Sequence, residues 1–194
     1  MKKINVDCHS MLEYRLCRRS LLKAGALALG ECLLPKALLG AVQESPSPER
    51  SLSLYNLHTG ESLRTVYWFN GQYLQDALSD INNILRDHRT QEIMPIDTGL
   101  LDLLHTIHST MNSKEMVHII SGYRSPVTNE HLRENSSGIA KNSLHMQGKA
   151  ADIRLPDQCL SSLRRAAAAL KRGGVGFYPD SDFVHVDVGR VRYW

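Results

Sequence analysis

Two short segments with alternating side chains decide the fold of this chain: KAADIRL at residues 149–155 and FVHVDV at residues 183–188. Successive side chains of a β-strand point to opposite faces of the sheet. In the first segment the aliphatic side chains share one face, and Asp152 points to the other. In the second segment the valines share one face, and His185 and Asp187 lie on the opposite one. We therefore expect two strands, each with a core face and a polar face, and if they are neighbours Asp152 and His185 converge.

The segments around these strands predict an α+β domain. Further strands are predicted by segments 51–55, 63–68, 117–121 and 175–178. Helices are predicted over 72–87, after an N-cap at Asp97, over 128–134 and over 160–171. Turns join the first two strands and the last two strands as hairpins. This mixed order predicts a small, mainly antiparallel sheet with helices packed to one side.

Residues 1–41 have the composition of an export signal. Arg18 and Arg19 follow a basic region and precede an apolar stretch over residues 24–41, which is too short and too interrupted for a membrane span. The order of basic region, paired arginines, apolar run and small residues resembles the twin-arginine export signal. That resemblance implies a periplasmic protein, with the signal cleaved near Ala41 or retained as a membrane anchor.

The rest of the chain divides into a linker and one domain. Residues 42–49 are rich in proline and serine and predict a flexible linker, which leaves residues 50–194 as the folded domain. The net charge of +3 is concentrated in the first 41 residues, so the remainder is close to neutral. A nucleic-acid-binding domain would carry a basic excess, and this class is therefore not expected.

Three residues suit a catalytic metal site. His145 precedes the first of the two strands, and Gly148 lets the chain turn back over that strand. Together with Asp152 and His185 it provides two imidazoles and one carboxylate, a ligand set that leaves a fourth position of zinc open for water. Zinc lowers the pKa of such a water to about 7 and polarises a carbonyl. We therefore expect a Zn²⁺ site at these three residues.

Longer motifs include the same residues. The chain contains His-x-x-Gly-x-Ala-x-Asp at 145–152, preceded by SGYRS at 121–125 and followed by His-x-Asp at 185–187. This pattern, over about residues 50–194, resembles the D-alanyl-D-alanine metallopeptidase/hedgehog-like superfamily, and within it the exported murein endopeptidases of Gram-negative bacteria. The resemblance implies the corresponding fold, zinc ligation by the same three residues, and contact of Arg124 with the substrate or the developing oxyanion.

The general base has two candidates. Many members of this superfamily place a glutamate three residues before the last zinc histidine, where this chain has the shorter Asp182. Others place a histidine or an acidic residue beside the ligand, and Asp187 fits that arrangement. We favour Asp187, because on a strand it shares a face with His185, whereas Asp182 lies in the turn. The alternative role of Asp187 is to orient His185 through a hydrogen bond.

The predicted function is zinc-dependent hydrolysis of peptide cross-links in peptidoglycan, with its stem peptides as the partner. The resemblance leaves two bonds open, D-alanyl–diaminopimelate and diaminopimelate–diaminopimelate. A D,D-carboxypeptidase is the enzymatic alternative. A non-catalytic, zinc-containing module that binds the cell wall is the alternative from another class. The sequence gives no indication of the oligomeric state.

Overall fold

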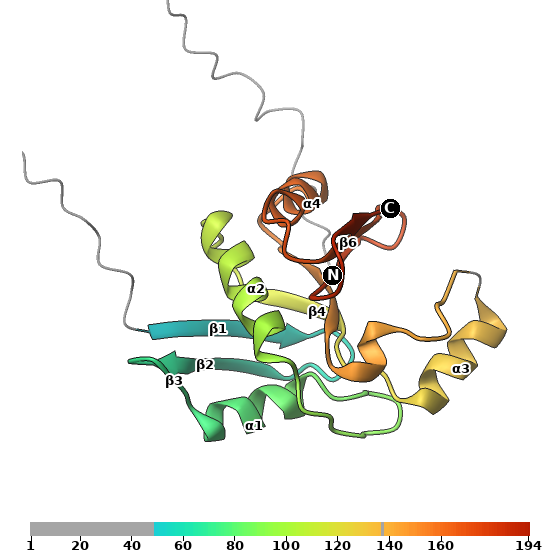
Figure 1. The fold of residues 1–194 in the computed structure, drawn as a ribbon, viewed down its shortest axis with the longest axis horizontal. Coiled ribbons are helices and arrows are strands. Elements are labelled where there is room, and N and C mark those ends of the chain that lie inside the picture. Colours follow the sequence, from blue (N-terminus) through green and yellow to red (C-terminus); the bar gives the residue numbers. More distant parts are fainter. Residues whose placement is uncertain (1–48, 137) are drawn as a thin grey trace, which may run out of the picture. The chain divides into compact units, whose positions relative to one another are not determined.

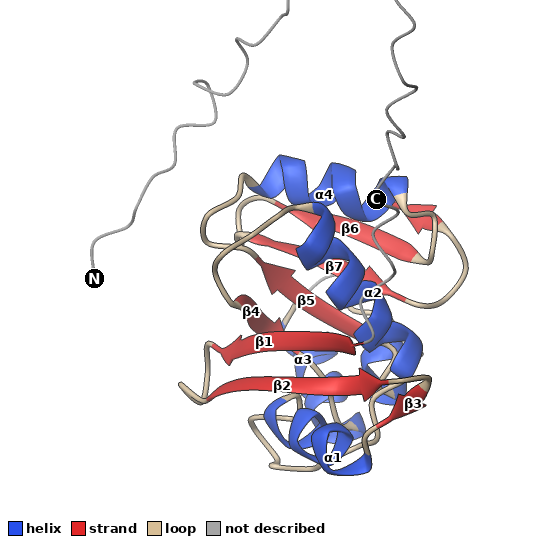
Figure 2. Ribbon diagram, turned by 90° about the vertical axis from the view of Figure 1, so that its left-hand side faces the viewer, coloured by secondary structure: helices blue, strands red, loops and turns tan. Residues whose placement is uncertain are grey.

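The computed structural model describes residues 49–136 and 138–194. The predicted export signal and nearly all of the predicted linker lie outside the described residues. Within them, eight strands form one sheet in the order β3-β2-β1-β4-β5-β7-β6-β8 (Figures 1 and 2). The strands are β1 (Glu49–Asn56), β2 (Ser62–Phe69), β3 (Gln72–Tyr73), β4 (Val117–Ser121), β5 (Ala150–Arg154), β6 (Gly174–Tyr178), β7 (Phe183–Asp187) and β8 (Arg192–Tyr193).

The sheet is mixed, which partly corrects the expectation of a mainly antiparallel one. The two predicted hairpins, β1–β2 and β6–β7, are confirmed as antiparallel pairs. However, β1 pairs with β4 in parallel, and β6 pairs with β8 in parallel. The β1–β4 pair is made by a long crossover that contains β2, β3 and two helices. The alternation within a strand does not depend on the direction of its neighbour, so this feature was not visible in the sequence.

Four α-helices and one short 3₁₀ helix accompany the sheet, which confirms the α+β class. They are α1 (Gln75–Ile84), α2 (Thr98–Thr110), α3 (Pro126–Asn135), the 3₁₀ helix η1 (Leu144–Gln147) and α4 (Leu160–Ala169). The predicted N-cap of the second helix is confirmed, because the Asp97 side chain accepts a hydrogen bond from the backbone of Gly99. Among the described residues, no helix is long and apolar enough to cross a membrane.

One hydrophobic core joins one face of the sheet to three helices. Apolar side chains of α1, α2 and α4 cluster with alternate residues of the strands, including Ile153 of β5 and Val184 and Val186 of β7. Helix α3 contributes no side chain to this cluster, so the prediction of helices on one side holds for the other three. Because alternate residues face the core, Asp152 and His185 are directed to the opposite face of the sheet.

Candidate metal centre

Strand pairing brings two of the predicted ligands together. Strands β5 and β7 are antiparallel neighbours, and their register places Asp152 directly opposite His185. Directly opposite residues have side chains on the same face and within contact distance. The convergence that the alternation predicted is therefore present, on the polar face of the sheet.

The third residue, His145, reaches the same place from η1. The Ser143 hydroxyl caps this short helix by accepting a hydrogen bond from the backbone N–H of His145. Gly148 follows with a φ of +65°, a conformation that L-residues with side chains rarely adopt. A Cβ atom at this position would lie 2.4 Å from the carbonyl oxygen of Pro95, so only glycine fits. The turn that returns the chain to β5 thus depends on Gly148, as the sequence indicated.

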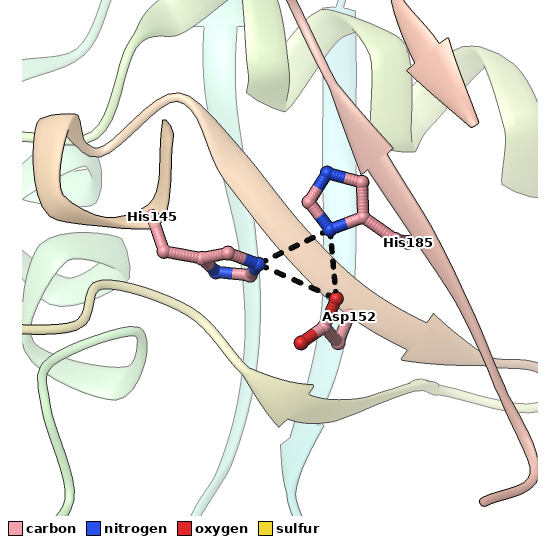
Figure 3. Close-up of side chains that lie close together, drawn as sticks. All are labelled: His145, Asp152 and His185. Atoms are coloured by element: carbon pink, nitrogen blue, oxygen red, sulfur yellow. Dashed lines mark hydrogen bonds and ion pairs between the residues drawn. The ribbon is translucent and has the colours of Figure 1, made fainter. Parts of the chain in front are cut away.

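The three side chains converge on one point (Figure 3). The Nε2 atom of His145 lies 3.2 Å from Nδ1 of His185 and 3.3 Å from Oδ1 of Asp152. The last two atoms are 2.9 Å apart. All three residues are nearly or fully buried, with His145 3% and Asp152 6% exposed. Among the described residues, this is the group of histidine, cysteine and carboxylate side chains with the spacing of a metal site.

Contacts behind the two histidines indicate which ring nitrogens face the centre without a proton. The Nδ1 atom of His145 lies 2.8 Å from the carbonyl oxygen of Gly122, which only accepts hydrogen bonds. The Nε2 atom of His185 lies 3.0 Å from a carboxylate oxygen of Asp187. In the neutral rings these nitrogens carry the proton, so the opposite nitrogens present lone pairs to each other and to Asp152. Three converging lone pairs repel one another unless a cation lies between them, and this donor set fits a zinc ion.

The electrostatics of the centre favour an ionised carboxylate. Burial by itself raises the pKa of Asp152, but in the metal-free protein protonated rings of His145 and His185 attract and donate to its carboxylate, which outweighs burial and holds that pKa well below its ordinary value. Asp152 therefore offers a negative charge in a site nearly closed to water, where a cation is strongly attracted.

Arg124 lies at the edge of the centre, just beyond the end of β4, with few hydrogen bonds. Its Nη2 atom is 3.6 Å from Asp152 Oδ2 and 3.5 Å from the Ser121 hydroxyl, both long contacts. Its Nε atom is buried and has no hydrogen-bond partner among the described residues. Burial lowers the pKa of Arg124, and the negative charge of Asp152 opposes this effect. The guanidinium thus has donors left for an oxygen atom of another molecule.

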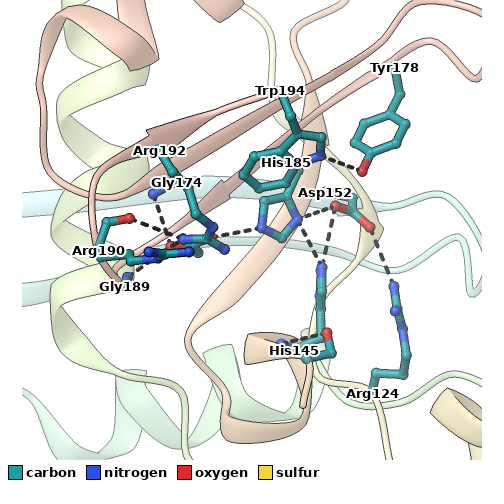
Figure 4. A network of polar contacts seen from close by, with 12 residues as sticks. Arg124, His145, Asp152, Gly174, Tyr178, His185, Gly189, Arg190, Arg192 and Trp194 are labelled. Carbon is teal, nitrogen blue, oxygen red and sulfur yellow. Dashed lines mark hydrogen bonds and ion pairs between the residues drawn. The ribbon is translucent and has the colours of Figure 1, made fainter. Parts of the chain in front are cut away.

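The two candidate bases occupy different surroundings. Asp187 is fully buried and accepts hydrogen bonds from His185, from Arg192 and from the backbone of Gly174 and Gly189. Figure 4 labels these four partners. Asp187 contacts the nitrogen of His185 that faces away from the other two candidate ligands. Asp182 is exposed in the turn between β6 and β7, and its carboxylate pairs with Arg154 at 2.7 Å.

Sequence reasoning missed some residues beside the centre. Arg192 forms two hydrogen bonds to the Asp187 carboxylate, with Nη1 at 3.1 Å and Nη2 at 2.7 Å. The indole ring of Trp194 lies 5.3 Å from the ring of His185. Both residues come from the segment that forms β8, a strand too short to give an alternation signal. No pattern within residues 192–194 could have placed them there.

Comparison with known proteins identifies the family. A family model described as peptidoglycan L,D-endopeptidase MepK matches residues 44–194. The chain is 43% identical over 177 residues to the peptidoglycan L,D-endopeptidase MepK of Escherichia coli strain K12, which covers 91% of this chain and 96% of that protein. It is 36% identical over 178 residues to the probable peptidoglycan L,D-endopeptidase MepK of Haemophilus influenzae, a match that covers 91% of this chain and 95% of that protein. These matches confirm the resemblance to murein endopeptidases, and the chain belongs to the MepK family of peptidoglycan L,D-endopeptidases.

Proposed function

We propose that this chain hydrolyses the amide bond between two diaminopimelate residues in peptidoglycan cross-links. Membership of a family of peptidoglycan endopeptidases, which are metallopeptidases, supports the reaction class. Of the two bonds left open by the sequence, this one joins an L-centre to a D-centre, whereas the D-alanyl–diaminopimelate bond joins two D-centres. The term L,D-endopeptidase in the names of the relatives therefore favours the diaminopimelate–diaminopimelate bond as the one that is cleaved.

The single observation that carries the proposal is the convergence of His145, Asp152 and His185 on the polar face of the sheet. In this proposal the three residues hold a zinc ion, and the fold is related to the hedgehog-like metallopeptidases. When bound, the ion supplies a Lewis acid that polarises the scissile carbonyl and lowers the pKa of the attacking water. The protein contributes a rigid ligand set, because two of its members lie on paired strands and the third is fixed by η1.

We assign to Asp187 the orienting role. Its carboxylate accepts from the outer nitrogen of His185, which fixes the ring and increases the basicity of the inner nitrogen. With five donors around it in a fully buried position, it has no free lone pair directed at the open side of the centre. This geometry weighs against Asp187 as the base, the role that its shared strand face with His185 favours in the sequence.

Asp182 is then the proposed proton acceptor. It lies three residues before His185, the position that many members of the superfamily give to the base. Its partner Arg154 is two residues beyond Asp152 on β5 and so shares the polar face of the sheet. An exposed ion pair of this kind contributes about 0–1 kcal/mol, so the carboxylate can leave Arg154 at little cost when substrate binds.

Arg124 is proposed to bind an oxygen of the substrate. Its contacts within the protein are long, and its Nε atom has no partner among the described side chains and backbone atoms. A guanidinium next to the metal ligands stabilises negative charge as it develops on the scissile carbonyl oxygen.

The proposed location is the periplasm, where the substrate lies. The paired arginines and the apolar run of residues 1–41 support export by the twin-arginine route. The signal is then either cleaved near Ala41 or retained, and a retained signal would attach the protein to the membrane.

The decisive experiment is digestion of purified sacculi by the full-length protein, with and without a chelator, followed by mass identification of the released fragments. Chelator-sensitive loss of diaminopimelate–diaminopimelate dimers is the expected result. Release of single D-alanine residues would indicate a carboxypeptidase instead. Binding to sacculi without any cleavage by the zinc-loaded protein would favour a binding module.

A further inference from the structure

Two aromatic side chains stand on the same face of the sheet as the metal ligands. Strands β6 and β7 place Gly176 opposite His185 and Tyr178 opposite Phe183. Tyr178 therefore shares the face of His185, whereas Phe177, between them, packs against the hydrophobic core. Tyr178 stacks on Phe183 with ring centroids 4.5 Å apart and remains 36% exposed.

Trp194 joins this face through the backbone of β6. Its N–H donates to the carbonyl oxygen of Val175, and its carbonyl oxygen accepts from the N–H of Phe177. These two bonds span Gly176, where an added Cβ atom would lie 2.6 Å from the indole ring. The missing side chain at residue 176 thus creates the space in which the indole lies beside His185.

The two aromatic residues are joined by a hydrogen bond. The indole Nε1–H of Trp194 donates to the Tyr178 hydroxyl at 2.7 Å (Figure 4). A hydroxyl that accepts this bond can still donate its own proton. Among the described residues, no acceptor takes the proton of Tyr178, and the group is open to solvent. Figure 4 shows this hydroxyl turned toward the side of the centre where Asp152 lies.

Neither residue is needed to fill the core. Trp194 is 46% exposed, and neither side chain belongs to the hydrophobic cluster. The Arg192 guanidinium covers part of the indole at 4.9 Å from the ring centroid, which helps to hold the ring in place. Rigid, half-exposed aromatic rings with one directed donor are typical of surfaces that bind a ligand.

We propose that Tyr178 donates a hydrogen bond to a carbonyl or carboxylate oxygen of the stem peptide, and that Trp194 is the positioning residue that aims its hydroxyl. The inference rests on the proposed function, because it takes the cross-linked stem peptide as the ligand. Tyr178 and Arg124 then contact the substrate as two separate donors, one from β6 and one from beyond β4.

The kinetic test compares three variants on a purified muropeptide dimer with a diaminopimelate–diaminopimelate bond. Tyr178→Phe should lower kcat/KM by about 2- to 12-fold, the worth of one net hydrogen bond, with unchanged zinc content. Trp194→Phe keeps a ring beside His185 but removes the indole N–H. It should therefore lower kcat/KM by less than Tyr178→Phe does. The double variant should be no worse than Tyr178→Phe alone, because Trp194 acts through Tyr178. Additive losses would refute the positioning role.

Tyr193→Phe is the matched control. Its hydroxyl also belongs to a half-exposed tyrosine of the neighbouring strand, but it donates to the backbone of Ala168 in α4. It should leave kcat/KM unchanged. If wild type cuts the dimer and Tyr178→Phe cuts it equally well, the inference fails. If wild type does not cut the dimer, the proposed function fails instead.

A binding measurement tests the pair without depending on turnover. The chain has two tryptophans, so Trp68→Phe leaves Trp194 as the reporter of fluorescence. The tripeptide monomer that cleavage would release should bind the zinc-loaded protein and change the emission of Trp194 saturably. Adding Tyr178→Phe should raise the dissociation constant by about 2- to 12-fold. Monomer binding seen by calorimetry with an unchanged emission spectrum would overturn the proposal.

Discussion

At the scale of single residues, His185 is held on both ring nitrogens, and the two contacts differ in function. The inner nitrogen faces Asp152 and His145, and the outer one faces Asp187. Asp187→Asn should weaken zinc binding by about 10- to 100-fold, because the amide no longer fixes the ring through a charged acceptor. Activity should be largely restored by excess zinc. Zinc titration combined with dimer cleavage measures both effects.

The matched control is Asp182→Asn, which removes the proposed proton acceptor and leaves the proposed zinc ligands and their buried support intact. Zinc content should stay normal, while kcat falls by about 10²- to 10⁴-fold. The opposite pattern, a large zinc-independent loss in Asp187→Asn with near-normal activity in Asp182→Asn, would restore Asp187 as the base.

His145 is the proposed ligand whose removal tests the centre most directly. Its inner nitrogen completes the group of converging lone pairs, so His145→Ala should lose most of the bound zinc. Metal analysis compares the zinc content of the purified variant with that of wild type, which is expected to hold close to one ion per chain. Full occupancy in the variant would remove His145 from the ligand set.

At the scale of elements, Asp87 ties the loop after α1 to the start of α3. Its carboxylate is 1% exposed and accepts from the backbone N–H groups of Ser125 and Arg89 at 2.8 and 2.9 Å. These bonds hold the segment that carries Arg124 at the edge of the centre. Asp87→Asn should reduce the free energy of unfolding at pH 7 by about 1–3 kcal/mol, because buried donors lose a charged acceptor. Urea denaturation measures the difference.

The same residue predicts a pH dependence with a definite sign. Burial alone raises the pKa of Asp87, but the surrounding donors outweigh it and hold that pKa well below the ordinary 3.8. A group whose pKa is lower in the folded state stabilises the fold above its unfolded pKa and loses this contribution as pH falls through the folded pKa. The difference in stability between wild type and Asp87→Asn should therefore shrink below about pH 4. A difference that grows toward low pH would contradict this account.

At the scale of the whole molecule, the chain combines a proposed export signal with a folded domain. The twin-arginine route carries folded proteins, so the domain could bind its metal before export. Replacing Arg18 and Arg19 with lysine should leave the precursor in the cytoplasm, since the paired arginines are the distinctive part of the signal. Fractionation of cells followed by immunoblotting checks the prediction. Normal periplasmic accumulation would count against the route.

The sequence by itself determined the local parts of this protein. Alternation in 149–155 and 183–188 showed which side chains face the core and which are polar, and both strands form as expected. The motif at residues 145–152 and the His-x-Asp segment at 185–187 supplied three candidate ligands that do converge. These predictions succeeded because the period of a strand and the positive φ of the turn at Gly148 are properties of the local backbone.

Tertiary structure alone decided the relations between distant segments. The parallel pairing of β1 with β4 and the short strand β8 arise from packing between parts of the chain far apart in sequence. Which nitrogen of His185 faces Asp152, and therefore which role Asp187 can take, depends on the rotation of the His185 ring. That ring lies beside Trp194 and contacts Asp187, which Arg192 holds in turn. No spacing rule encodes such a rotation, because it is set by the hydrogen-bond donors and the rings that the completed fold brings around the residue.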